Sequence, residues 1–389
     1  MYGSGLSKDI VNEARVSYLE FIKSTNISGH TYRLTLNAEP SPYARCFALF
    51  GYALLQQESL YLSDAKSWAL AIKNDLKDYQ NHRKTQVDDL LKDKAYLQLL
   101  TFSLSALAIL GELGEDPLEE FVRPILERKV DSYFEQTGVL DGKAGTGNLA
   151  MFLGVLLIHA REYLKIDTTH QIDQWCALHL KYMNKFGFWG KANSMSHLQF
   201  QNGYHQYEIF DYLGINNPLA TKAADWVASL SDSKGHFSPY VGGGGCYDYD
   251  AIFVITSAGK DAVDKHRTLI LKTVSTILSE QNKDGGFAES KYVRPRSISN
   301  LYMSLTHIMN SRGQALIERS RHAISLMRPR HNRITTHWSK YSREWDESDL
   351  WDSWFRMMLI ARVEVATSSC RREEWGFINY PGIGYYPTH

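Results

Sequence analysis

The feature that most constrains the fold is an internal repeat of about 50 residues. Four segments combine the end of a helical run, a polar turn that contains glycine, and a final apolar residue. They read YFEQTGV (133–139), YMNKFGF (182–188), LSDSKGHF (230–237) and LSEQNKDGGF (278–287). Their last residues, separated by 49, 49 and 50 positions, are Val139, Phe188, Phe237 and Phe287. This regular spacing predicts about six structural units that tile most of the chain.

Each unit is predicted to be a pair of helices. One helix of a pair is apolar around its whole circumference, which indicates burial; these runs are 148–164, 204–215, 250–259, 301–309 and 350–365. The other helix has a polar face and is expected on the outside, as in 168–183 and 219–230. Two further runs, 42–57 and 94–113, also have the buried character.

These pairs predict an all-α fold of the (α/α)6 toroid class, in which the starts of the inner helices meet at a central pocket. Aromatic, glycine-rich turns and polar residues at equivalent inner-helix starts favour a closed ring over an open superhelix. The toroid is expected to be a single domain over residues 1–365. The remaining tail, 366–389, is rich in Gly, Pro and Tyr and is expected to pack on it.

Charge and composition narrow the partners and the location. The chain has 43 Lys and Arg against 43 Asp and Glu, so nucleic-acid binding, which relies on uncompensated cations, is not expected. The longest nearly unbroken apolar run, 150–160, is shorter than the roughly 20 residues that span a bilayer. With no transmembrane segment and no secretory signal pattern, a cytoplasmic location is expected. The four cysteines lack metal-ligand spacing, so neither a metal nor a cofactor is expected.

The segment QNKDGGF (281–287) resembles the Gln-x-x-x-Gly-Gly-aromatic turn of the terpenoid cyclase and protein prenyltransferase superfamily. FGFW (186–189) and SKGHF (233–237) look like degenerate copies of it. In that superfamily such turns connect outer helices to the next inner helices of an α-toroid. The resemblance therefore implies the same fold for roughly residues 80–360.

The segment VGGGGCYDYDAIFV (241–254) resembles the Asp-x-Asp-Asp motif of class II terpene cyclases, whose middle Asp protonates an alkene or epoxide. Asp248 and Asp250 match the first two aspartates, and Ala251 stands at the position of the third. The resemblance implies Asp250 as general acid and Asp248 as its hydrogen-bonding neighbour. A carboxylic acid stays protonated near neutral pH when it is desolvated or close to a second carboxylate. The alternative interpretation is that Asp248 caps a helix.

The same segment is similar to the zinc region of protein prenyltransferase beta subunits at Gly245, Cys246 and Tyr247. Gly244 stands where that family has a ligand Asp, and Tyr302 is the nearest match to its downstream His. A zinc site is therefore not expected. Cys246 and Tyr247, together with Tyr249, crowd one inner-helix start and are expected to contact substrate.

Polar residues at other inner-helix starts are further candidates. His205 and Glu208 are three positions apart, so they share a helical face and could serve acid–base chemistry; an ordinary helix pair is the alternative. Asn202 and Tyr204 stand beside them and are expected to bind substrate. Asn148 begins another inner helix, where it either binds substrate or caps the helix.

Aromatic residues complete the predicted pocket. Trp351, Trp354 and Arg356 follow Asp349, a predicted N-cap, and Trp189 follows an earlier turn. These side chains either wall the pocket or belong to core helices, with Arg356 paired to a carboxylate. Aromatic walls suit sugar rings as well as carbocations, so the composition does not choose between these two ligands.

Three functions follow from these patterns. The preferred one is a terpenoid-cyclase-like enzyme that cyclises a polyprenyl substrate with Asp250 as general acid. The second is a carbohydrate-active enzyme, a glycoside hydrolase or polysaccharide lyase, that uses Asp248 and Asp250 with His205 and Glu208. The third is a non-catalytic helical-repeat subunit that binds a partner protein. Both enzymes would hold a small-molecule or oligosaccharide substrate in the central cavity.

Overall fold

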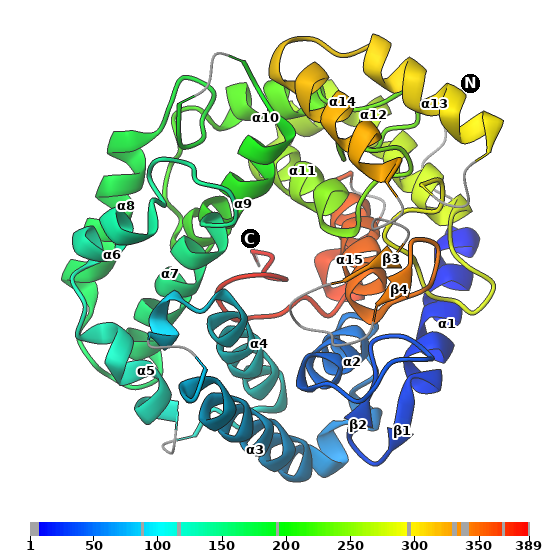
Figure 1. Cartoon of the computed structure of the whole chain (residues 1–389). Coiled ribbons are helices and arrows are strands. Elements are labelled where there is room, and N and C mark those ends of the chain that lie inside the picture. Colours follow the sequence, from blue (N-terminus) through cyan, green and yellow to red (C-terminus); the bar gives the residue numbers. More distant parts are fainter. Residues whose placement is uncertain are drawn as a thin grey trace. The chain divides into compact units, whose positions relative to one another are not determined.

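The structure is a computed structural model that describes residues 8–86, 89–114, 118–191, 194–293, 297–328, 333–335, 342–367 and 370–387. These residues are mostly α-helical (Figure 1). The short strands β1 (Asn26–Ser28) and β2 (Thr31–Tyr32) pair antiparallel, as do β3 (Arg333–Ile334) and β4 (Arg343–Glu344). Among the described helices, none combines the length and the apolar character needed to cross a membrane.

The chain divides into two compact units, each built from several segments. The first unit comprises Met1–Gly51, Ala192–Gln201 and Leu219–Trp375, and the second comprises Tyr52–Lys191, Asn202–Pro218 and Gly376–His389. The helices of the first unit are α1 (Lys8–Ser24), α10 (Ala220–Ala228), α11 (Gly245–Ser257), α12 (Lys260–Ser279), α13 (Ile298–Met309), α14 (Gly313–Leu326) and α15 (Leu350–Ala366). Those of the second are α3 (Ala65–Lys84), α4 (Lys94–Leu110), α5 (Leu118–Leu126), α6 (Val130–Thr137), α7 (Gly147–Glu162) and α8 (Thr169–Tyr182). Two helices contain residues of both units, α2 (Pro42–Leu54) and α9 (His197–Leu213). The expectation of a single domain over residues 1–365 stays a prediction.

Most of the predicted helices begin where the sequence placed them. The starts of α2, α4, α7, α8, α10 and α15 lie within one residue of the predicted starts. In α7 the whole stretch 147–160 is buried, as its continuous apolar pattern indicates. Helices α9 and α11 begin earlier than predicted, by seven and five residues, because polar residues and glycine interrupt the apolar pattern in their first turns.

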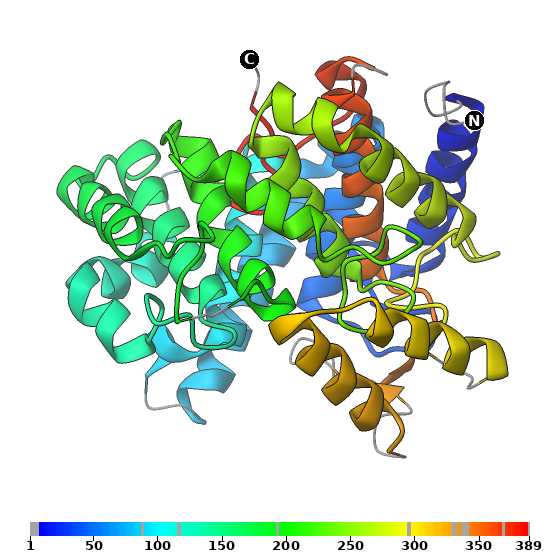
Figure 2. The same cartoon turned by 90° about the horizontal axis from the view of Figure 1, so that it is seen from above.

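The prediction that residues 301–309 form a buried inner helix is wrong. The run 301–309 was expected to be buried, but it belongs to α13, where Ile298, Tyr302 and Met309 are 89%, 68% and 80% exposed. Helix α11 packs against α15, which lies beside it in both views, and α13 packs against α14 (Figures 1 and 2). An apolar composition is shared by core helices and by helices that line a groove, so the pattern alone could not separate the two.

The repeated turns share one hydrogen-bond pattern in three of the four predicted places. The backbone N–H of the first turn residue donates to the carbonyl of the residue four positions later. The N–H of the glycine three positions later donates to the carbonyl of that first residue. The first residues of these turns are Asn184, Asp232 and Asn282, with glycine φ angles of 88°, 91° and 87°. The positive φ explains why each turn needs glycine. The fourth segment differs, because Gly138 ends α6 as a left-handed C-cap.

The end of the chain is bound to the second unit by buried contacts. The N–H of Gly376 donates to the carbonyl of Leu54 at 3.0 Å. The hydroxyl of Tyr380 contacts Nδ1 of His159 at 2.9 Å, and both side chains are buried. The residues just before this segment belong to the first unit, where the Trp375 indole donates to Glu364 at 3.0 Å.

Candidate functional site

The four glycines of 242–245 run through a buried charged network in the first unit. A Cβ on Gly243 would lie 2.2 Å from Oδ2 of Asp248, and one on Gly245 would lie 1.9 Å from Oδ1 of Asp352. Gly243 also has a φ of 73°, which disfavours any side chain. The glycines are therefore needed for the close approach of the backbone to two carboxyl groups.

Asp248 is held by three donors. Its carboxylate contacts Nδ1 of His236 at 3.0 Å, Nη1 of Arg356 at 2.7 Å and the backbone N–H of Phe237 at 2.7 Å. Burial alone would raise the pKa of Asp248, but the two cations and the hydrogen bonds lower it overall. Gly244 is the N-cap of α11, so Asp248 binds neighbouring elements instead of capping the helix. Asp248 is therefore an ionised anchor.

His236 joins Asp248 to a second carboxylate. Its Nε2 lies 3.1 Å from Oε1 of Glu280, and the imidazole is fully buried. Burial lowers its pKa, but the charges and hydrogen bonds of the two carboxylates outweigh burial and raise the pKa to about 10. His236 is therefore an imidazolium near neutral pH. Sequence reasoning missed this residue, although it stands in the recognised SKGHF turn directly before Phe237.

A second cluster surrounds Arg343, which comes from β4. Its guanidinium lies 2.5 Å from Asp352, 3.4 Å from Asp349 and 3.5 Å from Glu289. Asp349 is the N-cap of α15, as predicted, and accepts hydrogen bonds from the N–H groups of Trp351 and Asp352 at 2.8 and 3.1 Å. One guanidinium thus faces three carboxyl groups.

The excess of acids over bases in this cluster favours protonation of its most buried carboxyl groups. Burial, the charges of Glu289 and Asp349, and a hydrogen bond to Glu289 together raise the pKa of Asp352 well above its ordinary value, although Arg343 opposes the rise. Burial also raises the pKa of Asp349. Asp352 and Glu289 therefore form a carboxyl pair beside one guanidinium, and burial together with the neighbouring acids favours the protonated form of Asp352.

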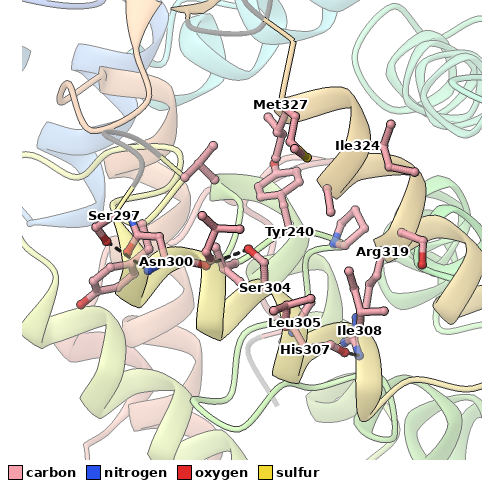
Figure 3. A pocket seen from close by; sticks show the side chains of 18 residues that line it. Tyr240, Ser297, Asn300, Ser304, Leu305, His307, Ile308, Arg319, Ile324 and Met327 are labelled. Atoms are coloured by element: carbon pink, nitrogen blue, oxygen red, sulfur yellow. Dashed lines mark hydrogen bonds between the residues drawn. The ribbon is translucent and has the colours of Figure 1, made fainter.

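Glu289 is the partly exposed member of this pair. The hydroxyl of Tyr240 donates to its Oε1 at 2.5 Å. The Tyr240 side chain also lines a cavity of about 420 Å³ beside α13 and α14 (Figure 3). Burial and the charge of Glu289 raise the pKa of Tyr240, so the hydroxyl keeps its proton. None of Glu289, Tyr240, Arg343 and Asp352 was predicted, because two lie in turns, one in a two-residue strand and one inside an apolar helix.

The predicted residues around the glycine segment differ in exposure. Asp250 is fully buried in α11, and the ring of Tyr249 packs edge-on against that of Phe355 with centroids 5.3 Å apart. Cys246 and Tyr247 are half-buried. The charges of Glu289 and Asp250 both contribute to a raised pKa of Tyr247, after burial as the main cause. Glu289 and Asp250 therefore both act on the Tyr247 hydroxyl through their charges.

The predicted aromatic wall is part of the core of the first unit. The ring centroids of Trp351 and Phe47 are 5.0 Å apart, and those of Trp354 and Phe50 are 5.1 Å apart. Trp354 is 1% exposed. Arg356 on the same helix pairs with a carboxylate, that of Asp248. These contacts are those of a core helix, and a role in substrate binding stays a prediction.

The predicted His–Glu pair lies in the second unit, on α9. Nδ1 of His205 is 3.9 Å from Oε2 of Glu208, and both side chains are buried. Burial, assisted by the charge of Lys94, lowers the pKa of His205 well below its ordinary value, so the imidazole is neutral. The ring of Tyr204 packs on that of His205 with centroids 4.1 Å apart. Their catalytic role, together with Asp248 and Asp250 of the first unit, stays a prediction.

Three other predicted residues of the second unit have structural contacts. Oδ1 of Asn202 accepts a hydrogen bond from the N–H of Gly147 at 2.8 Å, in the first turn of α7. Thr146, and not Asn148, is the N-cap of this helix, and Asn148 is buried in its first turn. The indole of Trp189 donates to the carbonyl of His179 at 2.9 Å and is 3% exposed.

The comparisons with known proteins add one finding. No protein-family model and no curated protein matches the chain. It is similar to a solved structure of a glycosidase variant in complex with glucose, with a TM-score of 0.53, 11% identity, and coverage of 93% of this chain and 100% of that chain. At this identity the likeness shows the fold alone. The predicted fold class, an all-α toroid of the (α/α)6 type, is confirmed. The resemblance to terpenoid cyclases stays a prediction.

Proposed function

We propose that the protein is a carbohydrate-active enzyme that hydrolyses glycosidic bonds, with Glu289 as the proton donor and Asp352 as the residue that keeps the proton available. The observation that carries the proposal is the buried carboxyl pair at Arg343, in which the pKa of Asp352 is raised well above its ordinary value. The likeness to a glycosidase bound to glucose supports the same class of substrate.

Glycoside hydrolysis needs one carboxyl group that holds a proton and a second carboxylate near the sugar. Asp352 is fully buried, so it reaches a substrate only through Glu289, which is partly exposed and hydrogen-bonded to it. Protonation of the leaving oxygen by Glu289 would then draw the shared proton from Asp352. The predicted residue Asp250 also acts on Tyr247 through its charge, but it is fully buried and, like Asp352, does not face a substrate directly.

The first test measures reducing-sugar release from a panel of oligosaccharides and from aryl glycosides. Glu289→Gln is expected to lower kcat on oligosaccharides by about 10²–10⁴-fold, the usual contribution of general acid catalysis. The loss is expected to be much smaller on nitrophenyl glycosides, whose leaving group needs little protonation. Asp225→Asn, which removes a surface carboxylate paired with Lys265 and His266, is the matched control.

The second test concerns Asp352 as a positioning residue. Asp352→Asn removes a neighbouring acid that shares its proton with Glu289, so the acidic group of the pH–rate profile is expected to titrate at lower pH. The rate near neutral pH falls, and part of it returns as the pH is lowered. Loss of activity without this displacement would mean that Asp352 has only a structural role. Hydrolysis that is equal in the wild type, Glu289→Gln and Asp225→Asn would refute the proposed function.

A further inference from the structure

The cavity beside the α13–α14 hairpin is a second candidate site within the first unit. It has a volume of about 420 Å³, within the range of about 300–1,000 Å³ typical of small-molecule sites. Aliphatic side chains from both helices line most of it, among them Leu305, Ile308, Ile324 and Met327 (Figure 3). Leu305 and Ile324 are 55% and 59% exposed, so the cavity is open to ligands from outside.

A buried cation, Arg319, lines the same cavity (Figure 3). Arg319 is 4% exposed, and within the described residues its Nη atoms donate to neutral acceptors: the carbonyl of His307, the hydroxyl of Ser311 and the carbonyl of Leu230. Its Nε has no hydrogen-bond partner in the part of the chain that the structure describes. Three hydrogen bonds thus fix the guanidinium in place, and its Nε–H remains unused.

The nearby carboxylates are engaged elsewhere. Glu318 accepts a hydrogen bond from the backbone N–H of His197 at 2.7 Å, and Asp232 accepts those of Lys234 and His236 at 2.7 and 2.9 Å. Both act on Arg319 through their charges, yet burial prevails and lowers its pKa to about 10. Within the described ranges, neither forms an ion pair with Arg319. A buried guanidinium without an ion-pair partner favours an incoming anion.

A second, more polar cavity is lined by the same cation. A smaller cavity of about 90 Å³ shares Val241, Tyr292, His307 and Arg319 with the larger one, and it is also lined by Lys234, Asn310 and Asp232. Burial, with the charge of Arg319, lowers the pKa of His307 to about 4, so this imidazole is neutral near pH 7. Arg319 is therefore shared by a larger, mostly apolar cavity and a smaller polar one, which is also lined by Lys234 and Asp232.

We propose that this site binds an amphipathic carboxylate with a single alkyl chain, whose head pairs with Arg319 and whose chain lies between α13 and α14. The site is distinct from the Glu289–Asp352 pair, so this binding goes beyond the proposed hydrolysis. The ring of Tyr240 lines the cavity while its hydroxyl donates to Glu289, so this residue contacts both sites.

The test is calorimetric titration of the full chain with decanoate below its micelle concentration, with decanol as the ligand that lacks the charge. We expect one decanoate per chain and at least tenfold weaker binding of decanol. Arg319→Gln is expected to weaken decanoate binding at least tenfold, whereas Arg321→Gln, which removes an exposed cation of the same helix, leaves it unchanged.

A second pair of variants does not depend on the buried arginine. Leu305→Asp places a negative charge in the exposed wall of the cavity, and Leu305→Asn places a neutral group of similar size there. We expect decanoate to bind at least tenfold more weakly to Leu305→Asp than to Leu305→Asn. Equal affinities for decanoate and decanol, equal affinities of the two Leu305 variants, or no decanoate binding to the wild type would overturn the proposal.

Discussion

The imidazolium of His236 gives the protein a stability that depends on pH in a defined direction. Both ring nitrogens face buried carboxylates, those of Asp248 and Glu280, and the pKa of His236 is raised to about 10. A raised pKa in the folded state contributes stability that is complete below the unfolded pKa of 6.5. That contribution is lost as the pH rises through about 10.

The size of the effect follows from the interval between these two values. Each pH unit between about 6.5 and 10 changes the free energy of unfolding by about 1.4 kcal/mol for one retained proton. At pH 7 the proton on His236 is therefore worth up to about 4 kcal/mol, and near pH 10 it is worth almost nothing. His236→Gln lacks this charge at every pH. We expect the variant to be less stable by up to about 4 kcal/mol at pH 7 and nearly as stable as the wild type at pH 10.

The assay is urea unfolding of both proteins at intervals between pH 6.5 and 10, followed by tryptophan fluorescence. The difference between wild type and variant cancels the other groups that titrate in this range. His266→Gln is the matched control, since this histidine pairs with the surface residue Asp225 and is 15% exposed at its side chain. Its difference from wild type is expected to be below about 1 kcal/mol at pH 7. A constant difference between wild type and His236→Gln across the range would refute the assignment of the charge to His236.

Two further predictions concern packing and a buried hydrogen bond. Gly243→Ala is expected to lower the free energy of unfolding by about 3 kcal/mol, because its Cβ would collide with the carboxylate of Asp248. Gly111→Ala is the control, since Gly111 has a similar φ of 69° but open space around it, and this variant is expected to lose only about 1 kcal/mol. Tyr380→Phe is expected to lose about 1–2 kcal/mol, because Nδ1 of His159 is left buried without its hydroxyl partner. Urea denaturation midpoints of the variants and the wild type check both predictions. Equal losses for the two glycine variants would contradict the first prediction, and an unchanged midpoint for Tyr380→Phe would contradict the second.

The fold was predictable from the sequence because it depends on periodic features. Continuous apolar runs predicted the starts of α7 and α15 to within one residue. Three of the glycine-containing segments form turns that share the same hydrogen bonds. The cap at Asp349 follows from local chemistry, namely an acid directly before an apolar helix. The error at α13 arose because a short apolar run has the same composition whether it lies in a core or beside a groove.

The candidate site was predictable only in part, because its contacts join residues far apart in the chain. Asp248 and Arg356, both nominated from the sequence, form an ion pair across 108 positions. Arg343 and Asp352 escaped notice because a charge in a short strand or inside an apolar helix carries no periodic signal. The raised pKa of Asp352 depends on burial and on the three carboxyl groups that face Arg343, and both are properties of the folded chain.

The most direct measurement of the central claim is the infrared difference spectrum between the wild type and Asp352→Asn at pH 7. If Asp352 holds the proton that Glu289 delivers, the wild type shows the carbonyl band of a protonated carboxylic acid, and the variant lacks it. The same band is expected to persist in Asp225→Asn. A difference spectrum that contains only the bands of an ionised carboxylate would contradict the account, because the pair would then have no proton to give.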